Sequence, residues 1–235
     1  MPDNAKPLIL LTRPQAQAER FAAELHDRTG GEVEVLIAPL LRIEPLDLPP
    51  LPPDAALVFT SENGVRAYAD AGAAAGQFAY CVGDRTRQAA RDVGLQAVSA
   101  GGAANDLIAL IRSHPPTGPL VHLHGRHVRG ELVERLRQHG IVISGHAVYD
   151  QVALPLAAAA RGALLSGQEV SVPLFSPRSA KLFAKALPDG SICRPVCIST
   201  ATRAALPAPI ANRASVAEAP TGAAMLNAVT RQLSP

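Results

Sequence analysis

Six pairs of polar or glycine residues stand where short apolar runs end, each directly before a stretch with helical spacing. The first backbone N–H groups of a helix are free and the helix dipole is positive there, so such turns can bind anions. The pairs are Thr12-Arg13, Thr60-Ser61, Gly83-Asp84, Gly125-Arg126, Ser176-Pro177 and Ser199-Thr200. Any one Ser, Thr or Asp among them also fits simple helix capping. Taken together, the pairs predict a binding site with many anion-accepting turns and few fixed cations.

Tyr149 is a second candidate for chemistry, as one of only three tyrosines. A neutral phenol can donate a hydrogen bond at pH 7, which would help a hydroxyl group to leave. A strand tyrosine packed at a hinge is the structural alternative. His122 and His124 would share one face of a strand, but no Cys or carboxylate completes a metal site, so an ordinary strand end is favoured. Because motifs for nucleotides, a serine nucleophile or catalytic zinc are absent, we predict no cofactor and no metal.

The polar turns occur in two copies. LVFTSENGVRAY and PLFSPRSAKLF share one layout, and their residues Phe59 and Phe175 are 116 positions apart (175 − 59). The next turns, at Gly83 and Ser199, have the same offset (199 − 83), and LILLTRP precedes LVHLHGR by 113 positions (126 − 13). We interpret the chain as a duplicated α/β unit, since this period is far too long for a solenoid.

Apolar runs alternate with amphipathic stretches along the chain, which predicts parallel sheets covered by helices on both faces. Strands are predicted at 7–12, 57–60, 78–83, 95–100, 119–125, at 163–166 or 170–175, at 195–199 and at 214–219. Helices are predicted from 13 to 29 and at 61–71, 85–93, 103–113, 128–139, 177–187, 201–206 and 222–233. Residues 33–43 and 142–153 are expected to be extended.

Two similar parallel-sheet domains follow from this alternation. The first is predicted to combine 1–36 with 154–235, and the second to span 44–143, with 37–43 and 144–153 as linker strands. Ligands of open parallel sheets bind beyond the carboxyl ends of the strands, where all six polar pairs fall. The expected site is therefore a cleft into which both domains direct their strand ends.

Composition excludes several classes of protein. The 235 residues are 48% hydrophobic and 18% charged, which is typical of a globular chain, and 3% aromatic, which argues against a base-stacking surface. The net charge of +2 without basic runs disfavours a grip on phosphate backbones. Three cysteines without CxxC spacing favour a reducing compartment. Without a signal peptide or membrane-spanning stretch, we expect a cytoplasmic protein, and without a long apolar patch a monomer.

The motifs together resemble the uroporphyrinogen-III synthase family. They are LLTRP, PLLRIEP, FTSENGV, CVGDRT, LHGR-x2-R-x-EL, VYDQV, FSPRSAKLF, CISTAT and PTGAAML, in this order over nearly the whole chain. The resemblance implies two flavodoxin-like domains joined by a two-stranded β linker, with the active site in the cleft. The implied reaction closes linear hydroxymethylbilane to uroporphyrinogen III, inverting the last pyrrole ring and losing water, without metal or organic cofactor.

Roles carry over only where motifs match. VYDQV places the family's tyrosine at Tyr149, which is proposed to assist loss of the hydroxyl group. The implied substrate-binding residues are Thr60, Ser61 and Asn63 in FTSENGV, Thr86 in CVGDRT, Ser176 and Ser179 in FSPRSA, and Thr202 in CISTAT. The second copy has Ser199 where the family more often has glycine, as at Gly83. A non-catalytic two-domain module that binds a polycarboxylate or tetrapyrrole remains the alternative function.

Overall fold

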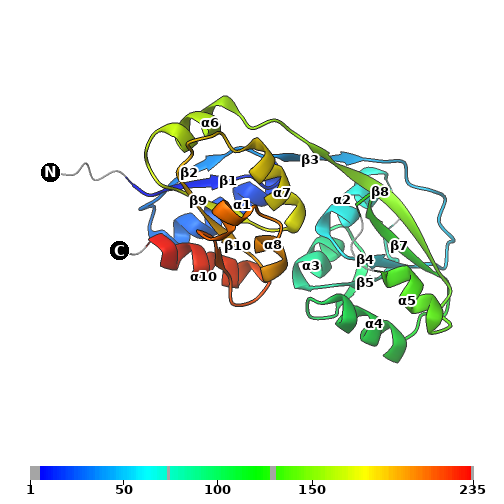
Figure 1. Ribbon diagram of the computed structural model, residues 1–235. Helices are drawn as coiled ribbons and strands as arrows, with labels where there is room; N and C mark the ends of the chain where they lie inside the picture. Colours follow the sequence, from blue (N-terminus) through cyan, green and yellow to red (C-terminus); the bar gives the residue numbers. More distant parts are fainter. Residues whose placement is uncertain (1–5, 73–74, 128–130, 234–235) are drawn as a thin grey trace. The chain divides into compact units, whose positions relative to one another are not determined.

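The computed structural model describes residues 6–72, 75–127 and 131–233, which belong to two compact α/β units (Figure 1). The first unit consists of Met1–Arg42 and Val152–Pro235, and the second of Ile43–Gln151. The chain therefore leaves the first unit after Arg42 and returns to it at Val152. The predicted linker strands, 37–43 and 144–153, span these two points.

The sheet of the first unit has five parallel strands in the order β2-β1-β9-β10-β11. Their bounds are β1 (Leu8–Leu11), β2 (Glu34–Ile37), β9 (Val170–Leu174), β10 (Cys193–Cys197) and β11 (Ser215–Val216). Counted in order of appearance this is 2-1-3-4-5, the flavodoxin order. The strand order reverses between β1 and β9, which is where ligands of such sheets bind.

Helices cover both faces of this sheet, which explains why β1 is buried at all four residues. They are α1 (Gln15–Thr29), α6 (Ala158–Leu165), α7 (Pro177–Ala186), α8 (Thr200–Arg203), α9 (Ala208–Ala211) and α10 (Gly222–Leu233). Ile9 and Leu11 pack in one cluster with residues of α1 and α10, whereas Leu8 and Leu10 pack on the opposite face with residues of α6 and α7. The alternation of the strand thus divides its side chains between two helix layers.

Of the two strand positions predicted as alternatives, 170–175 is confirmed by β9 and 163–166 is wrong, and one further prediction for this unit is wrong in part. The alternative strand at 163–166 lies in α6 and the loop after it, because AAARGALL consists mostly of Ala and Leu, which favour helix. The extended segment 33–43 is broken: β2 ends at Ile37, and the next strand begins at Leu41. Pro39, which has no N–H group to donate to a sheet, lies between the two strands.

The sheet of the second unit has six strands in the order β3-β8-β7-β4-β5-β6. Their bounds are β3 (Leu41–Pro45), β4 (Ala56–Phe59), β5 (Phe78–Cys81), β6 (Gln96–Ser99), β7 (Leu120–Gly125) and β8 (Ile143–Ala153). The pairs from β8 to β6 are parallel. Next to β8, β3 runs antiparallel, as the bonds from Leu46 N to Val148 O and from Leu154 N to Leu40 O require.

The two sheets share one strand order once β7 is counted as the first strand of the second unit. The sequence β8-β7-β4-β5-β6 then again reads 2-1-3-4-5, so β7 corresponds to β1 and β4 to β9. These are the same pairs that the offsets of 113 and 116 positions relate in the sequence. The duplication is confirmed at the level of topology, and the second copy is circularly permuted relative to the first.

Four helices are described in the second unit, two for each face of the sheet. They are α2 (Glu62–Asp70), α3 (Asp84–Asp92), α4 (Ala104–Ser113) and α5 (Leu132–Gln138). Phe59 packs with residues of α2 and α3, and Val58 with residues of α4 and α5. Residues 128–130 of the helix predicted at 128–139 lie outside the described residues.

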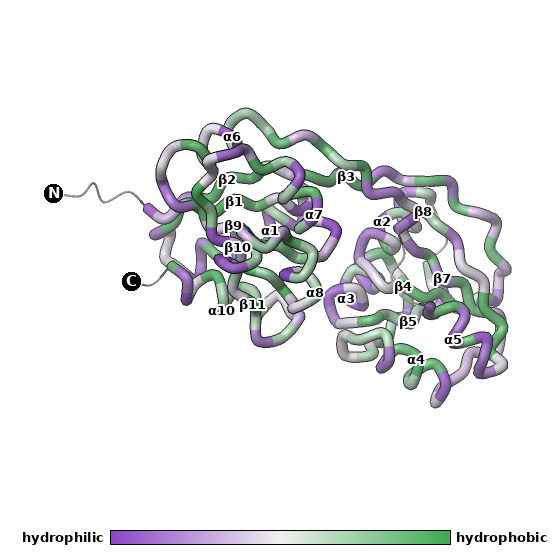
Figure 2. The backbone as a smooth tube through the Cα atoms, in the orientation of Figure 1, coloured by the Kyte–Doolittle hydropathy of each residue, from purple (hydrophilic) through white to green (hydrophobic). Residues whose placement is uncertain are grey.

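Hydropathy along the chain follows these layers. In Figure 2 the central strands are coloured mainly as hydrophobic, whereas α3 on the surface is largely hydrophilic. Among the described residues, no helix combines the length and the apolar character needed to cross a membrane.

Candidate active site

Tyr149 lies on β8 beside the end of β7, on the face of the sheet that α2 covers. The register between β7 and β8 shifts after His124, which pairs with Ala147, so that Gly125 pairs with Tyr149 instead of Val148. Such a bulge re-aims the side chains that follow it. The backbone N–H of Arg126 donates to the Tyr149 carbonyl at 2.8 Å and closes the strand pair beyond the bulge.

The absence of a side chain at Gly125 leaves the space that the Tyr149 ring occupies. A Cβ atom added at Gly125 would lie 2.6 Å from Cε2 and Cζ of Tyr149 and 2.9 Å from its hydroxyl oxygen. Real Cβ atoms do not approach other heavy atoms this closely, so the ring can lie against the end of β7 only because residue 125 is glycine.

The phenol of Tyr149 meets the first turn of α2. Ser61 is the N-cap of that helix and accepts a hydrogen bond from the backbone N–H of Asn63 at 3.2 Å. Burial raises the pKa of Tyr149, while side-chain hydrogen bonds with Ser61 and Asn63 lower it by a smaller amount. The phenol therefore carries its proton at neutral pH, and the two polar neighbours would stabilise the oxygen if the proton were given away.

Ser61 can be tested through the pKa of this phenol. Because its hydrogen bond lowers the pKa of Tyr149, Ser61→Ala is expected to raise that pKa further above the usual tyrosine value. Ultraviolet titration of the tyrosines, compared with Tyr149→Phe, measures the shift. Ser176→Ala is the matched control, since Ser176 caps α7 in the other copy and its loss costs a similar ~1 kcal/mol of helix capping. A Tyr149 pKa that does not move in Ser61→Ala, or moves equally in Ser176→Ala, would contradict the contact.

His122 is a buried residue of β7, three positions before Gly125. Its Nε2 lies 3.2 Å from Oγ1 of Thr60, and its ring centroid lies 4.8 Å from that of His124. Burial, followed by the neighbouring His124, lowers the pKa of His122 to about 3, so the ring is neutral at physiological pH. No group of three or more His, Cys, Asp or Glu within the described residues is arranged to hold a metal ion.

The buried histidine predicts a loss of stability in acid. In the unfolded chain His122 binds a proton below pH 6.5, whereas in the folded chain it binds one only below about pH 3. The free energy of unfolding therefore falls as the pH drops from 6.5 to about 3. At pH 5 the cost is about 2 kcal/mol, from 1.36 kcal/mol per pH unit. Denaturant unfolding at pH 7 and pH 5 should show a smaller decrease for His122→Gln than for the wild type. An equal decrease in both would contradict a neutral buried ring, and the exposed His139→Gln serves as the control.

Arg126 follows the end of β7 and forms an ion pair with Asp150, whose Oδ2 lies 3.3 Å from Nη1. The Arg126 side chain is 61% exposed, so its charge remains accessible to solvent. His127 Nε2 lies 3.4 Å from the other carboxylate oxygen of Asp150. Sequence reasoning did not select Asp150; its position directly after Tyr149 in VYDQV was the available signal.

The turn after β5 holds Gly83 and Thr86. Gly83 is the extended N-cap of α3, and a Cβ at residue 83 would make an ordinary van der Waals contact of 3.4 Å with the Gly102 Cα. Thr86 is 5% exposed and faces inward. An ion pair between Asp84 and Arg87, with 3.3 Å between Oδ1 and Nη2, lies on the same turn.

In the first unit, Arg13 and Ser176 follow the neighbouring strands β1 and β9. The Arg13 guanidinium lies 3.8 Å from the centre of the Phe175 ring, a cation–π contact that fixes its position. Ser176 caps α7 by accepting from the backbone N–H of Ser179 at 3.0 Å. Buried Thr12 precedes Arg13, and its Oγ1 has no hydrogen-bond partner among the described residues.

The turn after β10 repeats this capping. Ser199 accepts from the backbone N–H of Thr202 at 3.3 Å, and the two hydroxyl oxygens lie 3.1 Å apart. Thr202 is 0% exposed and Ser179 4%, so both hydroxyls support the turns from inside, whereas Thr200 is exposed.

The predicted residues thus form separate groups in the two units. In the second unit one group lies at the ends of β4 and β7, with Tyr149 on the middle of β8 beside it (Thr60, Ser61, Asn63, Gly125, Arg126 and Tyr149), and another at the end of β5 (Gly83 and Thr86). In the first unit they lie at the ends of β1 and β9 (Arg13, Ser176 and Ser179) and of β10 (Ser199, Thr200 and Thr202). Each unit therefore presents polar groups at the switch point of its own sheet.

Known proteins match this chain over most of its length. The family model described as "Uroporphyrinogen-III synthase HemD" matches residues 19–227. A crystal structure of uroporphyrinogen-III synthetase from Helicobacter pylori 26695 is similar with a TM-score of 0.67 and 17% identity, over 97% of this chain and 99% of the other. A mutant uroporphyrinogen III synthase from the extremely thermophilic bacterium Thermus thermophilus is similar with a TM-score of 0.53 and 18% identity, over 97% and 98% of the two chains. No curated protein sequence gives a significant match. At these identities the structures show the shared fold, and the family model shows the relationship.

Proposed function

The chain belongs to the uroporphyrinogen-III synthase family, and we propose from this premise that Tyr149 acts as the acid of its reaction. The protein is a cyclising lyase of tetrapyrrole (heme) biosynthesis. Its small-molecule substrate is a linear tetrapyrrole. The reaction closes hydroxymethylbilane to uroporphyrinogen III, inverts ring D and releases water. The family match gives no support to the alternative of a non-catalytic binding module.

The first chemical step is loss of the substrate's hydroxyl group. The C–O bond breaks, its electron pair leaves with the oxygen, which takes a proton and departs as water, and the remaining carbon is part of a reactive azafulvenium cation whose charge balances that of the tyrosinate. In our proposal the phenol of Tyr149 donates that proton. The observation that carries this assignment is the environment of the phenol: it is protonated at neutral pH, and Ser61 and Asn63 are placed to stabilise its oxygen after donation.

Substrate carboxylates are bound, in this proposal, by strand-end turns. The helices α2, α3 and α7 begin after Ser61, Gly83 and Ser176, and each offers the positive end of its helix dipole to an anion. Arg13 and Arg126 add guanidinium groups. Such a site needs no large basic patch, which agrees with a net charge of only +2.

The remaining roles are proposed for the substrate-binding turns. Thr60, Ser199 and Thr200 present hydroxyl groups to the ligand, while the buried Thr86, Ser179 and Thr202 keep the turns in shape. Holding a flexible chain in a ring-closing conformation can supply roughly 7–11 kcal/mol of a reaction barrier. Positioning is therefore the main contribution that we assign to these turns, with acid assistance from Tyr149 added to it.

Product analysis tests the function. Purified protein supplied with freshly prepared hydroxymethylbilane is expected to yield the type III isomer of uroporphyrinogen, separable from type I by chromatography after oxidation. Type I is the spontaneous product, so type I alone would overturn the function. Tight binding of substrate without conversion would instead indicate a binding module.

We also propose that the protein acts as a cytoplasmic monomer. All three cysteines are free and buried, and burial raises the pKa of Cys81 to about 12, which suits a structural residue in a reducing compartment. Four large hydrophobic side chains are exposed within the described residues, two in each unit: Phe78, Val142, Leu165 and Ile192. Light scattering should give a mass near 24.5 kDa, and twice that mass would contradict a monomer.

A further inference from the structure

A cavity of about 1000 Å³ lies at the amino-terminal edge of the second unit's sheet. Its walls include the starts of β4 and β5, at Ala56 and Phe78, and the loop that leads into β7 at Gly118. Because these strands are parallel, the candidate active site lies at their opposite ends, where Ser61 comes after β4 and Gly125 is the last residue of β7. The cavity is therefore separate from the candidate active site.

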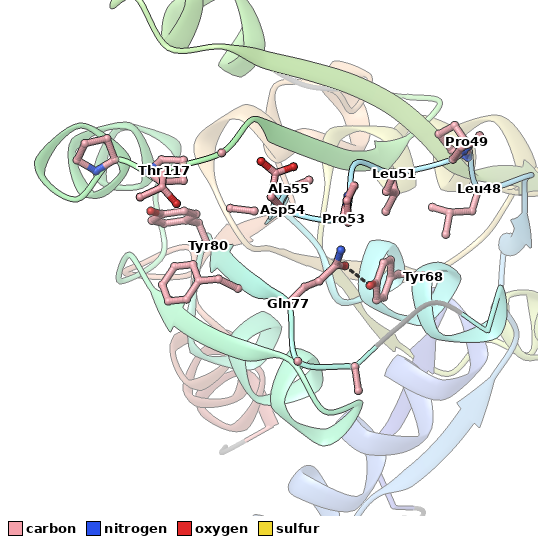
Figure 3. A pocket seen from close by; sticks show the side chains of 18 of the residues that line it. Leu48, Pro49, Leu51, Pro53, Asp54, Ala55, Tyr68, Gln77, Tyr80 and Thr117 are labelled. Atoms are coloured by element: carbon pink, nitrogen blue, oxygen red, sulfur yellow. Dashed lines mark hydrogen bonds between the residues drawn. The ribbon is translucent and has the colours of Figure 1, made fainter.

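Aromatic and apolar side chains make up much of the wall. Phe78 is 38% exposed and packs edge-to-face against Tyr80, with 5.0 Å between the ring centroids. Leu48 and Leu51 lie along another side (Figure 3). Such a surface suits a flat apolar body, and an exposed aromatic ring also attracts cations.

Three fixed contacts hold the polar groups of the cavity. The Tyr68 hydroxyl donates to Oε1 of Gln77, so the amide nitrogen of Gln77 is directed away from Tyr68 (Figure 3). The Tyr80 hydroxyl donates to the carbonyl oxygen of His114. A Cβ at Gly118 would lie 2.4 Å from the Asp54 carbonyl oxygen, so this glycine lets the two loops meet and sets the position of Asp54.

The charge of the cavity is negative. Among the described residues that line it, Asp54 is the one carboxylate, and none is Lys or Arg. Helix α4 ends at Ser113, and the next residue, His114, is part of the wall, so the negative end of the helix dipole adds to the charge of Asp54. A polycarboxylate such as the tetrapyrrole substrate would be repelled here.

We propose that this cavity binds a small organic cation with an aromatic body. Its amidinium or ammonium group pairs with the Asp54 carboxylate, and its ring packs on Phe78. A planar amidinium matches a carboxylate through two parallel hydrogen bonds, which makes it the best head group for such a site. The size of the cavity falls within the range of small-molecule sites.

Benzamidine is the probe, titrated into the isotope-labelled full-length chain and followed by backbone amide NMR shifts. Saturable shifts are expected at Gln77, Phe78 and Gly118. Benzoate carries the same ring with the opposite charge and is expected not to bind, whereas neutral benzyl alcohol should bind more weakly than benzamidine.

Two variants should change benzamidine affinity in opposite directions. Asp54→Asn removes the charge and should weaken binding at least tenfold. Gln77→Glu keeps an acceptor for Tyr68 and adds a second carboxylate, so binding should tighten several-fold. Glu134→Gln removes an exposed carboxylate elsewhere in the unit and should leave the affinity unchanged.

Equal affinity for benzoate and benzamidine, or unchanged benzamidine affinity in Asp54→Asn, would overturn the proposal. If the spectrum of Asp54→Asn shows that it does not fold, Gln77→Glu decides alone, because unchanged or weaker binding there contradicts the cation site. The cyclisation rate of Asp54→Asn should equal that of the wild type, so failure of the cation site leaves the proposed function untouched.

Discussion

Tyr149→Phe should slow enzymatic formation of uroporphyrinogen III roughly 100-fold while the fold is retained, the lower end of what acid catalysis contributes. Phenylalanine keeps the ring against Gly125 and removes only the hydroxyl group that Ser61 and Asn63 contact. The substrate also loses its hydroxyl spontaneously, so the variant's product mixture should shift towards type I as the uncatalysed route overtakes the slowed enzyme.

The measurement is kcat and KM for type III formation, with both isomers quantified. A loss confined to kcat indicates a role in the chemical step, whereas a rise in KM alone would reduce Tyr149 to a binding residue. Tyr68→Phe is the matched control, because Tyr68 lies in the same core cluster and its hydroxyl bonds with Gln77 at the other end of the sheet. Unchanged kinetics in Tyr149→Phe would remove the residue from the mechanism.

The fold was largely predictable because its signals are local. A parallel strand that is buried on both faces has a continuous apolar sequence, such as LILL at 8–11. The duplicated turns identified which elements correspond in the two copies. The permutation of the second sheet was hidden, since strand order depends on which strands pair and not on their own patterns. The helix α6 was also missed, because AAARGALL has few polar residues to mark a face.

The site was predictable as a set of strand ends but not as a set of contacts. Ser61 and Ser176 were identified from their position before a helix, and both cap one. No local pattern indicates that the register slips at His124 and brings Tyr149 opposite Gly125, because a bulge is a property of two strands together. In the sequence Gly125 was one end of a polar turn; in the structure it is the surface on which the Tyr149 ring lies.

Gly125→Ala is therefore expected to be among the most damaging single-methyl changes in the second unit. The new Cβ would lie 2.6 Å from two ring carbons of Tyr149, so the ring must leave its position or the strands must separate. Overpacking of this kind costs about 1–3 kcal/mol of stability. Displacing the phenol from Ser61 and Asn63 should also lower the rate of type III formation at least as much as Tyr149→Phe does.

A double-mutant cycle distinguishes a clash with the Tyr149 ring from the alternative that β7 does not tolerate any side chain at residue 125. In a Tyr149→Ala background the ring is gone, and adding Gly125→Ala should cost little further free energy of unfolding, measured with denaturant. Gly162→Ala is the control for a glycine substitution, because a Cβ there meets nothing within 4 Å and the residue lies inside α6, where alanine stabilises. If Gly125→Ala destabilises the Tyr149→Ala background as much as the wild type, its effect comes from the strand itself. An additive result would then leave the contact between Gly125 and Tyr149 without an energetic role, and the placement of the phenol would have to depend on Ser61 and Asn63 alone.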